Sequence, residues 1–446
     1  MLLKKCQIIL LVLLALSGAK VSLAQDTLRL SLNDALKIAQ DNNLNIRNSQ
    51  LDLKIAQKKI TETLAIGLPH IDGTAKYQYI PSVPTLPASN FDPKAAPGAV
   101  IELGVKQNIV YDLTVSQLIF NGAYLIGLKA SKVYSELSAE SLEKSILDVN
   151  ESVTNTYYMI LVGEESRKVL KSNLENVDKT LADIREMYKQ GFVEKTDAEQ
   201  LELTGNTITN AISQIDNNLE MGRRLMKIQL GLSEKTNLIF TDPLQMEEAE
   251  VKKLSVLANE PFILEKNVDY KLLTTSELLA KYDLKREISN YYPVINAFYD
   301  HQEKWKTPIF DFAPKNVIGI NLTLPIFSSG QRMAAVAQKR MTFEKATNSK
   351  LFAGNTILMQ SFQYQNDLKT KLEKFQIQKK SKELSDNIYQ RTLEKYKQGI
   401  SSSMDLMSVQ NQYLNNLTNY YQGIYDVVGA RTKLEKLFNI NQKISK

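Results

Sequence analysis

The residues of this chain that could carry out chemistry are few. It contains two histidines, His70 and His301, and one cysteine, Cys6, which lies near the amino terminus. Two histidines without a nearby cysteine are too few for most metal sites. We therefore expect neither a metal nor a cofactor.

Two glycine-containing segments have part of a catalytic motif and lack the remainder. Gly122 and Gly127 have the glycine spacing of a phosphate-binding loop, but Leu128 stands where that motif requires lysine. Ser329 precedes Gly330 without the glycine spacing and histidine of a nucleophile elbow. We predict no catalytic residue and no enzymatic activity.

The first part of the chain, residues 1–24, has the pattern of a secretory signal peptide. Lys4 supplies a positive start, residues 8–16 an apolar core, and Ala24 a small residue at the cleavage point. The apolar run is too short for a spanning helix, which needs about 20 residues. Cleavage would remove Cys6, so no disulfide framework is expected.

Composition argues against a nucleic-acid partner. The formal charge of +6 falls to +3 when three lysines leave with residues 1–24. That value is close to neutral for a chain of this length, whereas nucleic-acid-binding domains carry a marked excess of basic residues.

The prolines divide the chain into helical and non-helical parts. Of twelve prolines, six lie between residues 69 and 97 and four between 293 and 325. Proline in a helix interior removes a hydrogen bond and clashes with the preceding turn. The two stretches without proline, 98–242 and 326–446, are therefore free to form long helices.

The apolar residues of these stretches repeat every three or four positions. Such stripes lie on one helix face and are narrow enough for coiled-coil packing, although any helical bundle would show the same period. Two stripes have this spacing: Leu142, Ile146, Val149, Val153, Tyr157 and Ile160, and Leu406, Val409, Tyr413, Leu417, Tyr420, Ile424 and Val427.

The regions near the prolines have a period of two, which predicts strands with one apolar and one polar face. The alternation covers 71–79, 109–115, 295–299 and 318–324. Strands of about 10 residues can cross a bilayer at a tilt, and this alternation suits a barrel around water. A soluble antiparallel hairpin packed on a core would look similar, so both readings stay open here.

The chain contains an internal two-fold sequence repeat with an offset of 208 residues. Tyr-Lys-Gln-Gly ends at Gly191 and again at Gly399, and an aspartate follows each glycine, at Asp197 and Asp405. Gly122 and Gly330 show the same offset. Each predicted helix from Gly122 to Gly191 or from Gly330 to Gly399 would be about 100 Å long.

The repeat predicts the domain organisation. The first repeat covers 31–232, with a strand pair at 70–120. A connector follows at 233–265, and the second repeat covers 266–440, with a strand pair at 294–327. Return helices are expected at 198–232 and 406–440, and half-length helices at 31–66, where Ser31 and Asp34 form a capping-box pattern, and at 266–291. Four strands cannot close a barrel alone, because the smallest have about eight, so the chain must oligomerise.

Several segments of the sequence, taken together, resemble the TolC-like outer membrane efflux proteins. No single piece is specific, but together they cover residues 31 to 440 in the family's order. The matching pieces are Ser31-Leu32 with Ala35-Leu36, Leu68-Pro69, Ser116 to Gly122, Leu324 to Phe327 with Gly330, and the two glycine turns with their aspartates.

The resemblance implies a mainly α fold with a β-barrel segment. Each chain of a homotrimer would supply four transmembrane strands to a twelve-stranded barrel in outer-membrane lipid and helices to a coiled-coil tube in the periplasm. The function implied is the exit duct of a tripartite efflux or type I secretion system, supplied by a periplasmic adaptor and an inner-membrane pump. A structural periplasmic coiled-coil protein without a channel is the alternative, and a periplasmic enzyme is a weaker one.

The resemblance also assigns roles to individual residues. The turns at Gly191 and Gly399 match the family's tips, and barrel-to-helix turns are expected at Gly122 and Gly330. The candidate adaptor contacts beside the tips are Tyr188, Phe192, Tyr396 and Ile400, and the barrel-to-helix turns include Phe120 and Phe327. A glycine that only ends a helix is the alternative at both tips.

The predicted pore constriction and gate comprise Asp405, Asp197, Thr196 and Ser408. Asp405 matches one constriction aspartate, whereas Ser408 stands one helical turn further on, where the family has a second. Asp197 and Tyr396 match a closing pair. Asp405 could also be a helix-start aspartate without a pore role, since a negative charge is favourable there.

One expected closing bond is missing from the sequence. The position two residues past Gly399, where the family has a basic residue, is Ser401. We predict a gate held more loosely than in other members, so Ser401→Arg should lower the open probability in single-channel recordings. An unchanged open probability would count against this prediction.

Overall fold

The computed structural model describes residues 27–308 and 311–440. The signal peptide predicted for residues 1–24 lies outside this range. Among the described residues, no helix has the length and hydropathy needed to cross a membrane.

The chain forms two compact units, each of which draws on both halves of the sequence. The sheet unit comprises Asn48–Lys144 and Ile263–Met359. The hairpin unit comprises the described residues up to Arg47, Ser145–Phe262, and those from Gln360 onward. Helices α4 (Gly122–Lys189) and α8 (Gln331–Lys397) contribute residues to both units.

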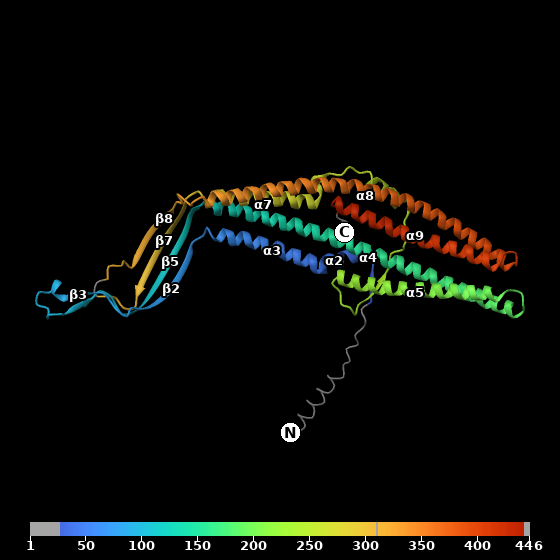
Figure 1. The fold of residues 1–446 in the computed structure, drawn as a ribbon, viewed down its shortest axis with the longest axis horizontal. Coiled ribbons are helices and arrows are strands. Elements are labelled where there is room, and N and C mark those ends of the chain that lie inside the picture. The colour runs from blue at the N-terminus through green and yellow to red at the C-terminus, as the bar shows by residue number, and fades with distance from the viewer. Residues whose placement is uncertain (1–26, 309–310, 441–446) are drawn as a thin grey trace, which may run out of the picture. The chain divides into compact units, whose positions relative to one another are not determined.

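A four-stranded antiparallel sheet in the order β2-β5-β7-β8 organises the sheet unit (Figure 1). These strands occur where alternation predicted them. Their bounds are β2 (His70–Tyr79), β5 (Gln107–Asn121), β7 (Val294–Lys304) and β8 (Asn316–Thr323). The loop between β2 and β5 carries a short hairpin of β3 (Thr85–Pro87) and β4 (Val100–Glu102), with the 3₁₀ turn η1 (Ala88–Asn90) between them.

The register places apolar residues together on one face of this sheet. Ile71, Val115, Tyr299 and Ile318 are successive partners across the four strands. Because side chains alternate between faces, the next row, which begins with Asp72, points to the other side. This row is therefore apolar across all four strands, whereas three of the four residues in the next row are polar.

The polar face has its own contacts. The Gln302 amide donates to the Asp112 carboxylate over 2.7 Å. Phe298 lies across Gly319, where a Cβ atom would come within 2.5 Å of the ring. A larger residue at Gly319 would therefore displace this aromatic side chain.

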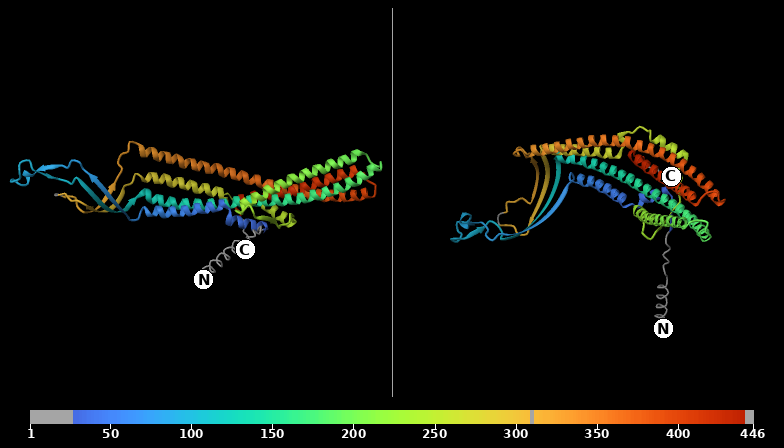
Figure 2. Two further views of the ribbon diagram at one scale, coloured as in Figure 1. Left: turned by 90° about the horizontal axis from the view of Figure 1, so that it is seen from below. Right: turned by 45° about the vertical axis from the view of Figure 1, so that its right-hand side comes forward.

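The helices of the sheet unit lie side by side in the order α3-α4-α7-α8, and both views of Figure 2 show this order. It repeats the order of the strands to which they connect. Tyr124 of α4 donates its hydroxyl proton to the Leu64 carbonyl of α3 (Leu44–Ala65). Thr275 of α7 (Val268–Ser289) donates to Glu140 of α4 over 3.0 Å. Thr347 of α8 donates to Glu277 of α7 over 2.8 Å. These contacts leave α3 and α8 as the two edges of one layer.

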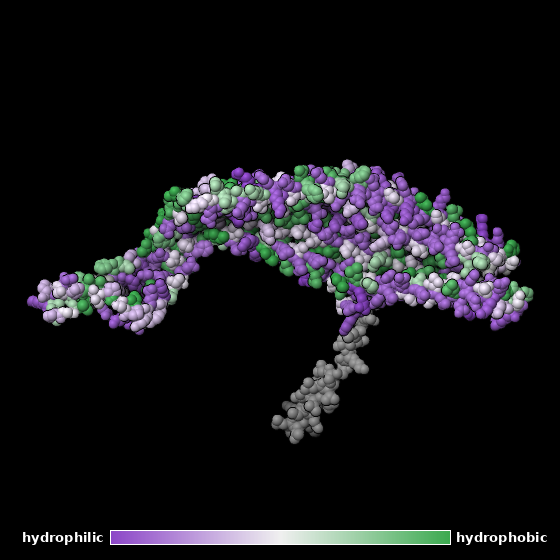
Figure 3. All heavy atoms as spheres, viewed as in Figure 1, coloured by the Kyte–Doolittle hydropathy of each residue, from purple (hydrophilic) through white to green (hydrophobic). Residues whose placement is uncertain are grey.

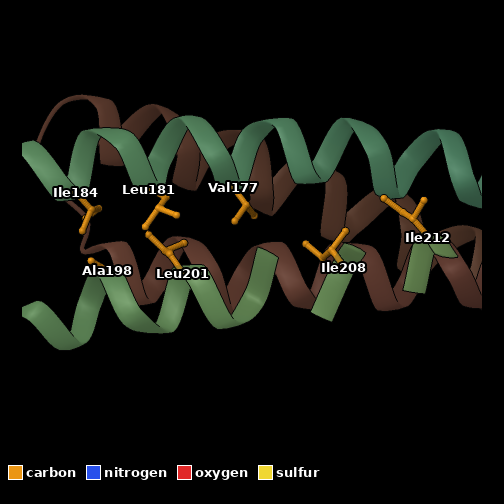
Figure 4. Close-up of a cluster of buried hydrophobic side chains, with 7 residues drawn as sticks. All are labelled: Val177, Leu181, Ile184, Ala198, Leu201, Ile208 and Ile212. Carbon is orange, nitrogen blue, oxygen red and sulfur yellow. The ribbon is translucent and has the colours of Figure 1, made fainter. Parts of the chain in front are cut away.

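The hairpin unit contains two helical hairpins. The return helices α5 (Lys195–Gln229) and α9 (Ser403–Leu437) begin and end three residues earlier than the predicted ranges 198–232 and 406–440. For α9 the reason is local, because Ser402 caps the helix amino terminus. Seven buried apolar side chains join α4 to α5 in Figure 4: Val177, Leu181, Ile184, Ala198, Leu201, Ile208 and Ile212.

The predicted helix 31–66 is interrupted. Helix α2 (Leu32–Asn42) ends before Asn43, whose side-chain oxygen accepts the backbone N–H of Asn45 at the start of α3. The buried Asn43 amide also donates to the Gln229 carbonyl over 2.7 Å. The capping box predicted for Ser31 and Asp34 is present.

The connector contains structure that the sequence patterns did not predict. Residues 233–265 form β6 (Asn237–Phe240), α6 (Glu248–Leu257) and most of the turn η2 (Leu264–Lys266). Strand β1 (Thr27–Leu30) pairs with β6 in parallel. The first described residues thereby pair with the connector.

Tyr157 of α4 fastens this small parallel sheet. Its fully buried hydroxyl lies 3.0 Å from the Leu30 carbonyl and 2.9 Å from the Asp242 carboxylate. Asp242 also accepts the Leu32 backbone N–H over 2.8 Å. Burial and the neighbouring carboxylate raise the pKa of Tyr157, so its hydroxyl remains a donor at physiological pH.

We predict that Tyr157→Phe destabilises the hairpin unit by about 2 kcal/mol, because it removes the buried hydroxyl that bonds the Leu30 carbonyl and the half-buried Asp242 carboxylate. Thermal unfolding of the purified protein would show a lower midpoint. Tyr134→Phe is the control, since Tyr134 lies exposed on the same helix. Equal midpoints for both variants would contradict this role of Tyr157.

Candidate functional site

Two turns in the hairpin unit have the same backbone geometry. Gly191 and Gly399 have φ angles of +79° and +73°. The N–H of the next residue bonds to the carbonyl five positions earlier, from Phe192 to Met187 over 3.0 Å and from Ile400 to Lys395 over 2.9 Å. This is the hydrogen-bond pattern of a Schellman helix end, in which glycine avoids the strain of a left-handed backbone.

Each turn presents an apolar side chain to its surroundings. Phe192 is 73% exposed and Ile400 is 70% exposed. Tyr188 is exposed beside the first turn, whereas Tyr396 is half-buried beside the second. The two turns therefore differ in which aromatic side chain is available to a partner.

Asp405 is held by the start of α9. It is the third residue of the helix, and its carboxylate accepts the Ser402 hydroxyl over 2.7 Å and the Ser402 backbone N–H over 3.2 Å. Hydrogen bonds from Ser402, and a further one from Ser401, lower the pKa of Asp405. Ser401, which stands where a basic residue was expected, is thus a hydrogen-bond donor to the predicted gate aspartate.

The other predicted gate residues make different contacts. Asp197 is the third residue of α5, and its N–H donates to the Glu194 carbonyl over 3.2 Å. The Thr196 hydroxyl donates to the Glu194 carboxylate over 3.2 Å. Ser408 is exposed on α9.

Tyr396 has a carboxylate neighbour that the sequence did not suggest. Burial raises the pKa of Tyr396, and the negative charge of Asp183 on α4 raises it further. Asp183 therefore acts on Tyr396 within one chain. The predicted closing pair of Asp197 and Tyr396 stays a prediction.

The predicted barrel-to-helix turns lie where strands of the sheet unit end. Gly122 begins α4 and packs closely, since a Cβ atom there would lie 3.1 Å from Ser289. Gly330 has a φ angle of +85° and precedes α8. Phe120 lies opposite Ile295 after a bulge that shifts the register of β5.

Arg332 is a residue of this region that the sequence analysis missed. Its guanidinium donates to the Pro325 carbonyl over 2.7 Å and to the Ser328 hydroxyl over 3.1 Å, and it lies over the Tyr291 ring. These bonds brace the turn between β8 and α8. The available signal was an arginine two residues after a predicted turn glycine.

The apolar sheet face lacks a cover in the described chain. Ile318 and Ile320 of β8 are 83% and 74% exposed. Figure 3 shows hydrophobic residues gathered where β8 meets α8 and along α8. Exposed aromatic residues occur near both ends of the strands: Tyr77, Tyr79 and Trp305 at one end, and Phe120, Tyr292 and Phe327 at the other.

The described residues contain no group of three or more His, Cys, Asp or Glu side chains that could hold a metal ion. His301 Nδ1 lies 2.7 Å from the Asn316 side-chain oxygen. His70 is the first residue of β2 and lies opposite Ser116.

Comparison with known protein families finds one sequence model that matches part of the chain. Residues 279–439 match the sequence model described as outer membrane efflux protein. No curated protein matches the chain by sequence.

The fold is similar to that of several solved outer-membrane channels. The CmeC outer membrane channel of Campylobacter jejuni has a TM-score of 0.76 at 18% identity, covering 92% of this chain and 85% of that chain. VceC of Vibrio cholerae has a TM-score of 0.70 at 12% identity, covering 92% and 96%. The MtrE outer membrane channel of Neisseria gonorrhoeae, solved in its open state, has a TM-score of 0.70 at 14% identity, covering 92% and 88%. The resemblance to the outer membrane efflux proteins is thus confirmed, by sequence for residues 279–439 and by fold for nearly the whole described chain.

Proposed function

We propose that this chain forms the outer-membrane exit duct of a tripartite efflux or type I secretion system. Three copies would close a twelve-stranded barrel in outer-membrane lipid, continued by a helical tube in the periplasm. The observation that carries the proposal is the amphipathic four-stranded sheet, whose apolar face is uncovered and whose two edge strands are unpaired within the described chain.

The strand directions fit closure by further copies. Strands β2 and β7 lead away from the helices that precede them, and β5 and β8 lead back to α4 and α8. The edge strand β8 of one copy would therefore lie antiparallel to β2 of the next, as in membrane barrels with an even number of strands. Such a head-to-tail contact forms a ring when the rotation closes.

The helical layer of the sheet unit has matching edges. Leu51 and Ile55 are exposed on α3, and Met341, Phe352 and Met359 are exposed on α8. Apolar side chains in such numbers mark contact surfaces rather than solvated ones. In the proposed ring, α8 of one copy would cover α3 of its neighbour, beside the paired strands.

The alternatives account for fewer features. A structural coiled-coil protein explains the long helices but leaves an apolar sheet face in water. A soluble hairpin would place that face on a core, whereas Ile318 and Ile320 are among the most exposed apolar residues of the chain. For an enzyme, the sequence lacks the lysine of a phosphate-binding loop and the glycine spacing of a nucleophile elbow.

The two glycine turns are the proposed binding sites for partner proteins. A periplasmic adaptor would bind the tips at Gly191 and Gly399, where Phe192 and Ile400 offer apolar contacts. An inner-membrane pump would supply the transported substrate and the energy.

The first test is the mass and shape of the detergent-purified mature protein, by light scattering and negative-stain imaging. We expect a threefold particle with a membrane-sized barrel and a tube. A monomer that remains in solution without detergent would contradict the proposal.

Neighbouring residues of β8 provide matched variants for this test. Ile320→Lys places a charge on the apolar face, which costs about 2–4 kcal/mol at the bilayer midplane. Asn321→Lys places the same charge on the polar face. We expect the first variant to lose outer-membrane assembly and the second to retain it, whereas a soluble protein would tolerate both.

We predict that Asp405→Asn reduces the preference of the channel for cations at neutral pH. Reversal potentials in planar bilayers would measure the change, and Ser408→Asp should strengthen the preference by adding a second carboxylate. Unchanged selectivity in Asp405→Asn would show that Asp405 does not face the pore.

The lowered pKa of Asp405 sets the pH dependence of this effect. The carboxylate should stay ionised, and selectivity persist, as the pH falls to about 3.9, the ordinary value for aspartate. Since the folded pKa is the lower one, the stabilising contribution of this cap is complete above that pH and declines as pH falls through the folded pKa.

A further inference from the structure

Three carboxylates lie together on the polar face of the β2-β5-β7-β8 sheet. Asp72 and Asp300 flank Thr114 in one row that crosses β2, β5 and β7. Asp112 lies two residues away on β5, on the same face because side chains alternate. Its carboxylate accepts the amide of Gln302, its partner in the register, so both side chains emerge from this face. We call the three aspartates the acidic layer.

Two lysines form a separate row on the same face. Lys76 of β2 and Lys304 of β7 flank Val110 of β5. Lys304 lies 2.7 Å from Asp311, which offsets its charge, whereas Lys76 is exposed and forms no ion pair within the described part of the chain. This row, which we call the basic row, therefore carries a net positive charge.

The two signs do not mix along the strands. Within β2, β5, β7 and β8, every carboxylate on the polar face belongs to the acidic layer, and every ammonium group on that face belongs to the basic row. An evenly solvated face would interleave the two signs. The segregation gives this face two zones of opposite potential.

The basic row lies farther from the helices than the acidic layer. Strand β2 leads away from α3 and reaches Asp72 before Lys76. Four residues of an extended strand span about 13 Å. The Debye length at 0.1 M salt is about 10 Å, so the row of Asp72 and the row of Lys76 are not merged by their own range.

We propose that these layers form a charge filter of two signs inside the barrel, with the acidic layer toward the periplasm and the basic row toward the outer mouth. This inference rests on the proposed function, in which the polar face lines the lumen and three copies repeat each layer around it. A small ion of either sign then meets one layer that repels it, whichever side it enters from.

The order of the layers makes the ionic current depend on its direction. The acidic layer concentrates cations and the basic row concentrates anions. A voltage that is positive on the periplasmic side drives these two populations toward each other, so ions accumulate between the layers and the conductance rises. The opposite voltage draws both populations apart and depletes the boundary. We therefore expect the larger current when the periplasmic side is positive.

Single-channel recordings in planar bilayers test the proposal. Protein added to one side keeps its helical tube on that side, because the polar helices cannot cross lipid. Asp405→Asn serves as the background, since a charged ring at one end of a pore also makes the current asymmetric. The current with the tube side positive should be about twofold larger than at the opposite voltage in 0.1 M KCl, and about equal to it in 1 M KCl, where the Debye length is about 3 Å.

Variants of Lys76 give the decisive comparison. Lys76→Gln removes the unpaired charge of the basic row and should lower the ratio of the two currents about twofold, whereas Lys76→Arg keeps the charge and the ratio. The control Lys252→Gln removes the same charge from an exposed position on α6 and should leave the ratio unchanged.

Reversal potentials provide a readout that damage to the fold would not imitate. Lys76→Gln should make the channel more selective for cations, because anions lose their attracting row. The double variant Asp72→Asn with Asp300→Asn should make it less selective for cations. Both variants should nevertheless lower the ratio of the two currents, since each removes one side of the boundary.

The outcomes separate this inference from the function on which it rests. A ratio that is unchanged in Lys76→Gln, or lowered equally in Lys76→Arg, would overturn the filter. Channels that conduct equally in both directions at 0.1 M KCl would also overturn it while leaving the duct intact. If the wild-type protein never conducts, the proposed function itself fails.

Discussion

The unpaired edges of the β2-β5-β7-β8 sheet are the constraint on which the remaining architecture depends. Strands β2 and β8 each present a row of backbone N–H and C=O groups on their outer side. Such edges invite pairing with another chain, and in a bilayer every one of these groups must be satisfied within protein. Copies of the same chain can meet this requirement and cover the exposed apolar edges of α3 and α8 at the same time.

The sheet also determines the order of the helices attached to it. Helices α3 and α7 each precede a strand of the sheet, and α4 and α8 each follow one. The order of the strands is therefore repeated by α3, α4, α7 and α8. Gly122 allows α4 to begin close to Ser289, and Arg332 braces the start of α8. The short turns thus transmit the arrangement of the strands to the helices.

Polar contacts are distributed unevenly within the hairpin unit. Charged groups join α9 to α4 and α6 near Lys436 and Arg431, whereas a neutral amide pair joins Asn173 to Gln410 nearer the turns. Charge-assisted hydrogen bonds are stronger than neutral ones. The stronger polar contacts of this unit therefore lie at the carboxyl-terminal end of α9, and the weaker ones lie nearer the glycine turns.

Features that depend on local period and local chemistry could be predicted from the sequence. The absence of proline and a period of three to four residues predicted α4, α5, α8 and α9, and a period of two predicted the four strands of the sheet. Gly191 and Gly399 indicated the turns, because the left-handed backbone there favours glycine. The capping pattern of Ser31 and Asp34 was equally local.

The tertiary structure alone decided the contacts between residues distant in sequence. Strands β1 and β6 have four residues each, too few to show a period, and they pair only because the fold brings them together. Tyr157 fitted the apolar stripe of α4, yet its hydroxyl binds Leu30 and Asp242. Asn173 and Gln410 likewise have no sequence signature, since an amide is ordinary on a helix surface. Their burial depends on which faces of α4 and α9 meet, and that is a property of packing rather than of local sequence.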